Sequence, residues 1–152
     1  MFKRICTIIT LLLLMLSLVA CGNKVAKTVD EFTSFMEGKN FITQNVTSTT
    51  QTNGLATAVI VALNDNYQVE YFAFKDNESG AGVFQHNKNL FDEKAPTKTL
   101  STELNSSNYN YYSFTSGDTY YMVSRIDNTM IYCVASKEYK DEINNIVDEL
   151  GY

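Results

Sequence analysis

The sequence predicts an α+β fold in which a largely antiparallel sheet of about five strands carries its helices on one face. Runs rich in β-branched and aromatic residues are separated by short turn signals, which is typical of antiparallel hairpins. Helical periodicity occurs near residue 30, again after residue 76, and at the carboxyl end. These observations predict the element order α-β-β-α-β-β-β-α.

The first predicted helix spans residues 28–38. Thr28 and Glu31 have the spacing of a capping box, in which each side chain binds the other residue's backbone N–H. The polar stretch 43–54 is predicted to be a loop or a ragged edge strand. Two strands follow at 56–63 and 67–74, and the Asn-Asp-Asn sequence between them favours a turn.

A second helix is predicted to start at Asp76 or Asn77. One apolar stripe supports it, formed by Ala81, Phe84, Lys88 and Phe91, with Val83 and Leu90 beside it. Gly80 and Gly82 weaken its first turn and indicate a flexible helix start. Residues 92–108 are polar, include the only proline of the sequence, and are predicted to form a long mobile loop.

Three more strands are predicted at 110–115, 119–126 and 129–135, joined by the turn signals Ser-Gly-Asp and Asp-Asn. Ser136 is the expected cap of a final helix, in which apolar residues recur at helical spacing up to Leu150. A C′ glycine, Gly151, follows. The acidic residues of this helix are expected on its solvated face.

The first twenty residues have the features of an export signal. Lys3 and Arg4 precede an apolar run at 5–18, which is shorter than the roughly 20 residues that cross a bilayer. The run ends in Leu-Val-Ala followed by Cys21. A short apolar run of this kind favours a cleaved signal peptide over a permanent membrane helix.

The segment Leu18-Val19-Ala20-Cys21 resembles the lipobox of bacterial lipoproteins. The resemblance implies that diacylglycerol is transferred to the Cys21 thiol and that the chain is cut before this residue. The expected division is a signal peptide at 1–20, a lipidated tether at 21–27 and a single domain at 28–152. The mature part is similar in general outline to the small uncharacterised lipoproteins of Gram-positive bacteria.

The expected location is therefore the outer face of the cell membrane, held through the lipid on Cys21, because two acyl chains anchor a protein stably. The mature chain would keep 132 of 152 residues. Without Lys3 and Arg4 it has 10 basic and 17 acidic side chains, a formal net charge of −7. Such a charge disfavours nucleic-acid binding, because no basic stripe is available to displace counterions.

The sequence offers no catalytic or metal-binding set, and we expect no cofactor. His86 is the only histidine, and a single histidine with a single unmodified cysteine disfavours a zinc site. Cys133, the one cysteine left after lipidation, lies in a strand that is apolar on both faces. It is expected to be central and inert.

Tyrosine is the unusual component of the composition, with ten residues. Adjacent tyrosines on a strand point to opposite faces, so we expect one core-facing row and one partly exposed row. The candidate binding surface consists of Tyr109, Tyr111, Tyr112, Tyr120, Tyr121 and Arg125. An alternative explanation for the tyrosines is their preference for strands. Arg125 could grip a ligand anion, pair with Glu70, or stack on a tyrosine.

The leading hypothesis is a non-catalytic, membrane-tethered binding or accessory domain of the cell envelope, with an envelope protein or a glycan as its partner. The tyrosine-bearing face or the 92–108 loop would form its interaction surface. A small envelope hydrolase is the alternative, and it would need two carboxylates facing one cleft. A solute receptor is less favoured, because such receptors close two lobes over a ligand.

Overall fold

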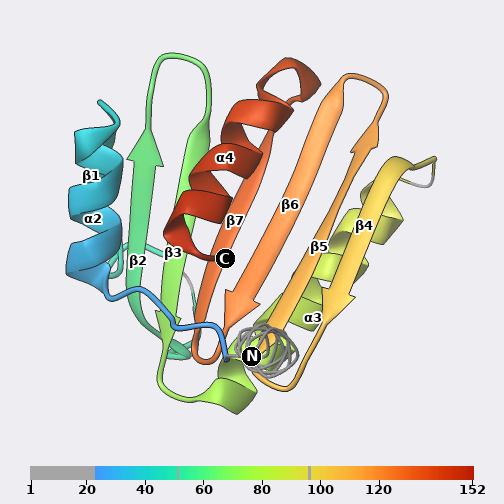
Figure 1. The fold of residues 1–152 in the computed structure, drawn as a ribbon. Coiled ribbons are helices and arrows are strands. Elements are labelled where there is room, and N and C mark those ends of the chain that lie inside the picture. Colours follow the sequence, from blue (N-terminus) through green and yellow to red (C-terminus); the bar gives the residue numbers. More distant parts are fainter. Residues whose placement is uncertain (1–22, 51, 96) are drawn as a thin grey trace, which may run out of the picture.

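The computed structural model describes residues 23–50, 52–95 and 97–152. Cys21 and the predicted signal peptide lie outside these residues. The described chain forms one seven-stranded antiparallel sheet and three α-helices (Figure 1). The predicted α+β class and the antiparallel sheet are therefore confirmed, while the predicted number of strands is too low.

The observed order is α-β-β-β-α-β-β-β-β-α. In chain order the elements are α2 (Val29–Gly38), β1 (Ile42–Asn45), β2 (Ala56–Leu63), β3 (Gln68–Phe74), α3 (Asn77–Lys94), β4 (Thr99–Asn105), β5 (Tyr109–Ser116), β6 (Thr119–Ile126), β7 (Thr129–Ser136) and α4 (Lys140–Leu150).

The sheet is built from two meanders that meet at its centre. Its strand order is β1-β2-β3-β7-β6-β5-β4, so the last strands of the two meanders, β3 and β7, pair with each other. Tyr71 lies opposite Ile131 in this central pair. Strand β7 is thus a central strand, as its apolar residues on both faces predict.

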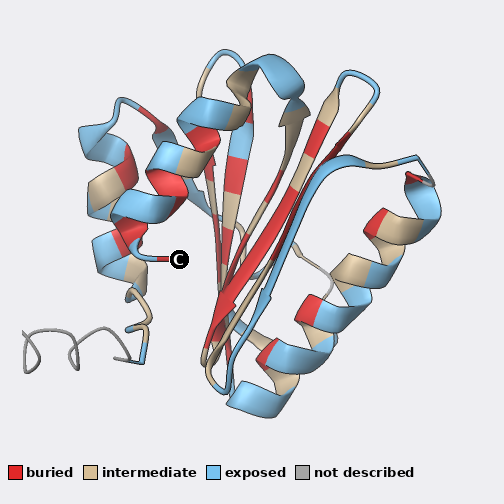
Figure 2. Cartoon of the chain, turned by 45° about the vertical axis from the view of Figure 1, so that its right-hand side comes forward, coloured by how far each residue is buried: buried red, intermediate tan, exposed pale blue. Residues whose placement is uncertain are grey.

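The helices cover both faces of the sheet, so the predicted arrangement on one face is wrong (Figures 1 and 2). Helices α2 and α4 pack on one face through residues such as Phe32 and Ile143, and α3 packs on the other through Phe84 and Phe91. The central strands bear apolar side chains on both faces, and one helical layer cannot cover both. We refer to these as the α4 face and the α3 face.

Two strands were not predicted at their observed positions. The predicted loop 92–108 is wrong, because α3 continues to Lys94 and the edge strand β4 follows. Every residue of β4 is exposed, so no apolar alternation marks it in the sequence. Strand β1 occupies the opposite edge and is similarly polar, which agrees with the ragged edge strand considered for 43–54.

The predicted helix ends are largely confirmed. Thr28 and Glu31 form the expected capping box, and Asp76 caps α3. Gly151 ends α4 with a φ of 87°. Ser136 is different, because it precedes a 3₁₀ turn at Lys137–Tyr139 and its side chain makes no capping bond. Among the described residues, no helix is long and apolar enough to cross a bilayer.

Candidate functional site

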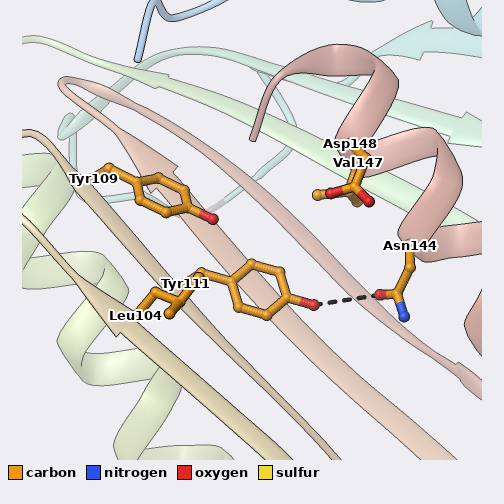
Figure 3. A pocket seen from close by; sticks show the side chains of 6 residues that line it. All are labelled: Leu104, Tyr109, Tyr111, Asn144, Val147 and Asp148. Atoms are coloured by element: carbon orange, nitrogen blue, oxygen red, sulfur yellow. Dashed lines mark hydrogen bonds between the residues drawn. The ribbon is translucent and has the colours of Figure 1, made fainter. Parts of the chain in front are cut away.

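A pocket of about 250 Å³ lies on the α4 face, between helix α4 and the β4–β5 edge of the sheet (Figure 3). Helix α4 covers the centre of the sheet and leaves this edge open (Figure 1). The lining residues are Leu104, Tyr109, Tyr111, Asn144, Val147 and Asp148. All of them lie in the described part of the chain, and we call this the tyrosine pocket.

Regular secondary structure positions the lining side chains. Tyr109 and Tyr111 are two residues apart on β5 and therefore point to the same face. Leu104 pairs directly with Tyr111 across the β4–β5 ladder. Asn144 and Asp148 are four residues apart on α4, so they are neighbours on one side of the helix.

The polar centre of the pocket wall is the Asn144 side-chain oxygen. It accepts hydrogen bonds from the Tyr120 hydroxyl at 2.5 Å and the Tyr111 hydroxyl at 3.3 Å. Tyr120 is fully buried, and this burial raises the pKa of its hydroxyl, which keeps it protonated as a donor. Figure 3 shows the Asn144 oxygen directed toward Tyr111. The bonds hold the amide of Asn144 in one orientation.

The segment before α2 lies against the same end of the domain. Asn108 donates a hydrogen bond to the Lys24 carbonyl at 2.8 Å, and Tyr71 donates one to the Lys27 carbonyl at 2.6 Å. Ala26 packs against the core of the α4 face. The part of the predicted tether from Lys24 to Lys27 is therefore in contact with the domain surface.

Lys24 extends from this segment to the pocket. Its ammonium lies 3.9 Å from the ring centroid of Tyr109, which is a cation–π distance. Burial lowers the pKa of Lys24, and the Asp148 carboxylate partly offsets this effect. A positive charge thus already lies beside the aromatic wall.

The six residues of the predicted binding surface are divided between the two faces of the sheet. Tyr109, Tyr111 and Tyr120 lie on the α4 face, and the first two are half-buried in the pocket wall. Tyr112 and Tyr121 lie on the α3 face against the aromatic cluster of α3. The structure therefore brings together the first three residues and separates them from the others.

Arg125 is also on the α3 face of β6, where it shares its side with Tyr121 and Val123. Arg125 is only 5% exposed. The guanidinium donates to the Asn110 side-chain oxygen and to the Asp127 carbonyl, both at 2.7 Å. These partners differ from Glu70 and from the tyrosines that the sequence suggested.

A second pocket, of about 310 Å³, lies on the α3 face between α3 and the loop after β1. Its wall combines polar and apolar side chains in equal number: Thr50, Thr52, Asn53, His86 and Asn87, and Leu55, Phe72, Phe74, Val83 and Met130. Its polar groups are partly engaged already, since Asn87 donates to the Val83 carbonyl. The loop on its rim includes Gln51, which lies outside the described residues.

The described residues contain no group of three His, Cys, Asp or Glu side chains that could hold a metal ion. Cys133 is buried, and burial raises the pKa of its thiol to about 12, with a further contribution from Glu70. The thiol donates to the Gln68 carbonyl. Neither described pocket has two carboxylates in its lining.

Four residues of the tyrosine pocket and its rim were not predicted as site residues from the sequence: Asn144, Val147, Asp148 and Lys24. Asn144 and Asp148 flank the apolar stripe of α4, and this flanking position is the signal that could have identified them. Asp148 is exposed, as expected for the acidic residues of this helix. Leu104 lies in the 92–108 stretch, which was predicted as a loop and as the alternative interaction surface, and which in the structure contains strand β4.

Comparison with known proteins gives one distant structural similarity. No family model and no curated protein matches the chain. A solved GTP-binding regulator from Thermotoga maritima is similar over 79% of this chain and 84% of its own length, with 10% identity and a TM-score of 0.48. A likeness at this level supports no inference about function.

Proposed function

We propose that this protein is an extracytoplasmic lipoprotein, anchored to the cell membrane through diacylglycerol on Cys21, whose domain binds a partner without catalysis. The sequence around Cys21 supports the anchor. The tyrosine pocket supports the binding role, since it is open, aromatic and held in shape by hydrogen bonds. Its partner would be an envelope protein or a glycan.

The observation that carries the proposal is the position of the pocket beside the bound tether. Lys24 contacts Tyr109, and Cys21 precedes Lys24 by three residues. Three extended residues span about 11 Å at most. A lipid on Cys21 would therefore hold the pocket close to the membrane surface, where a partner at the membrane could reach it.

The chemistry of the pocket favours binding over hydrolysis. Asp148 is the one carboxylate among the lining residues of the tyrosine pocket. Acid–base cleavage of a glycosidic bond uses two carboxylates that face one cleft. Tyrosine rings, a fixed amide and one carboxylate are instead typical of recognition surfaces.

Metabolic labelling tests the anchor. We expect the full chain to incorporate labelled palmitate in the native host and the Cys21→Ala variant to incorporate none. Cys6→Ala is the matched control and should label as strongly as the unaltered chain. Mass spectrometry of the amino terminus of the mature protein should show a lipid-modified Cys21.

Two results would contradict the proposal. Palmitate label that persists on Cys21→Ala would assign the lipid to another residue. An unmodified amino terminus, or an intact leader on the purified native protein, would remove the anchor.

A further inference from the structure

The tyrosine pocket offers groups that suit a positive charge. Its lining includes the rings of Tyr109 and Tyr111 and the Asp148 carboxylate, and none of its lining residues is basic. Aromatic faces attract an ammonium group through their quadrupole, and a carboxylate beside them strengthens the attraction. The groups that would bind a ligand cation are therefore gathered in one place.

The bound amide of Asn144 adds to this preference. Its side-chain oxygen accepts bonds from two tyrosine hydroxyls, Tyr111 and Tyr120. A tyrosine hydroxyl that donates its proton in this way keeps lone pairs free to accept. The Tyr111 hydroxyl also lies 3.2 Å from the Tyr120 hydroxyl, and its oxygen retains a lone pair that can accept a hydrogen bond from a ligand N–H.

Lys24 shows that an ammonium group fits beside this aromatic wall. Its nitrogen lies 3.9 Å from the centroid of Tyr109, and Asp148 favours its charged form. The backbone of Lys24 is fixed by Asn108, so its side chain is tethered next to the pocket. A tethered group acts at a high effective concentration, on the order of millimolar.

We propose that the tyrosine pocket binds the ammonium group of a ligand near the membrane surface, with Lys24 as its intramolecular competitor. This inference goes beyond the proposed function, since it names the charged group that the pocket binds, and it rests on the proposed function only for the membrane location. Recognition of the ammonium group itself depends on Tyr109, Tyr111 and Asp148 alone. A lipid headgroup and a soluble amine are two sources of the same chemistry.

Binding of n-butylammonium chloride to the purified full-length mature protein tests the recognition step. The protein is kept in a non-ionic detergent and carries ¹³C at the ring ε positions of tyrosine, so that ring resonances report on the pocket. Tyr109→Phe assigns the signal of Tyr109. The neutral probe 1-butanol controls for apolar binding.

We expect Lys24→Gln to bind n-butylammonium at least fivefold more tightly than the unaltered protein, because the competitor is removed. Lys27→Gln, in the same segment, is the matched control and should leave the affinity unchanged. Adding Asp148→Asn to Lys24→Gln should weaken binding at least tenfold. 1-Butanol should bind every variant weakly and equally.

The proposal is overturned if Lys24→Gln does not prefer n-butylammonium over 1-butanol, or if Asp148→Asn leaves the affinity unchanged. An unshifted Tyr71 signal in Lys24→Gln would show that the segment stays bound to the domain. These results are independent of palmitate labelling, so failure of the anchor and failure of ammonium recognition can be told apart.

Nanodiscs distinguish the source of the ammonium group. Lys24→Gln is placed in discs of phosphatidylglycerol alone or of phosphatidylglycerol with phosphatidylethanolamine. A Tyr109 shift that appears only with phosphatidylethanolamine identifies the headgroup as ligand. A shift that needs added n-butylammonium in both discs identifies a soluble amine, and no shift in any condition overturns the proposal.

Discussion

The two faces of the sheet are closed in different ways. Two helices, α2 and α4, share the α4 face, and α3 alone covers the α3 face (Figure 2). Helix α4 is fixed through side chains, including the hydrogen bond from Tyr120 to Asn144. Helix α3 starts against the backbone of the β6–β7 turn, with Gly80 at the point of approach.

This difference explains why the two pockets have different chemistry. On the α4 face, polar groups of tyrosine and asparagine extend from the core to the open β4–β5 edge, and the pocket there is partly polar. On the α3 face, the helix packs through an aromatic cluster, in which Phe91 contacts Phe114, Tyr121 and Tyr132. The pocket on this face has no tyrosine and no carboxylate in its lining, and it combines phenylalanine and aliphatic side chains with polar residues of α3 and of the loop after β1.

The largest expected effect concerns the backbone contact of α3. A Cβ atom at Gly80 would lie 3.0 Å from the Asp127 carbonyl oxygen and 3.4 Å from the Asn128 Cα. We expect Gly80→Ala to lower the free energy of unfolding by about 1–3 kcal/mol, because the turn must move. Urea unfolding followed by circular dichroism measures this change.

Gly82 provides the matched control on the same helix. Its Cβ position is open, and alanine is the better helix former by about 0.5–1 kcal/mol. Gly82→Ala should therefore raise stability while Gly80→Ala lowers it. Changes of the same sign in both variants would show that α3 is not positioned by a close approach at Gly80.

The second prediction compares adjacent tyrosines on the two faces. Tyr120→Phe removes a buried hydroxyl that donates to Asn144, and it should lower the free energy of unfolding by about 1 kcal/mol. Tyr121 lies on the α3 face, and its hydroxyl makes no hydrogen bond to the described residues. Tyr121→Phe should change stability by less than about 0.5 kcal/mol. Urea unfolding measures both changes. Equal losses of unfolding free energy would show that the Tyr120 hydroxyl on the α4 face stabilises the fold no more than the Tyr121 hydroxyl on the α3 face.

The sequence predicts those parts of the fold that depend on local patterns. Alternation along β5 and β6 correctly predicts that adjacent tyrosines face opposite sides, and the capping signals at Thr28 and Gly151 mark real helix ends. Strand β4 could not be predicted in this way, because an edge strand exposed on both faces has no apolar period.

The parts that depend on tertiary packing could not be predicted. Gly80 suggests a flexible helix start in the sequence, but in the structure it is buried against a turn almost fifty residues away. The face of the sheet against which α3 packs depends on which side of the central strands α2 and α4 cover. The same limit applies to the contact between Asn144 and Tyr111, since the position of Asn144 beside the apolar stripe of α4 does not show which strand lies opposite.

The smallest expected effect is the pH dependence contributed by Asp92 and Lys98 beside the α3 face. Burial raises the pKa of Asp92, but hydrogen bonds from Lys98 at 2.5 Å and Tyr112 at 2.6 Å outweigh this, so its pKa lies below the ordinary value. A carboxylate with a lowered pKa stabilises the fold above its unfolded pKa, about 3.9, and the contribution is lost as the pH falls through the folded value.

The Asp92 side chain is 39% exposed, so solvent screening keeps the contribution below about 1 kcal/mol. Urea unfolding at pH 7 and near pH 2.5 should therefore show a smaller loss for Asp92→Asn and for Lys98→Met than for the unaltered chain. A full loss retained in Asp92→Asn would show that the Asp92 pair is not what the falling pH disrupts and that other carboxylates with a lowered pKa, such as Glu31 or Glu103, carry the acid sensitivity.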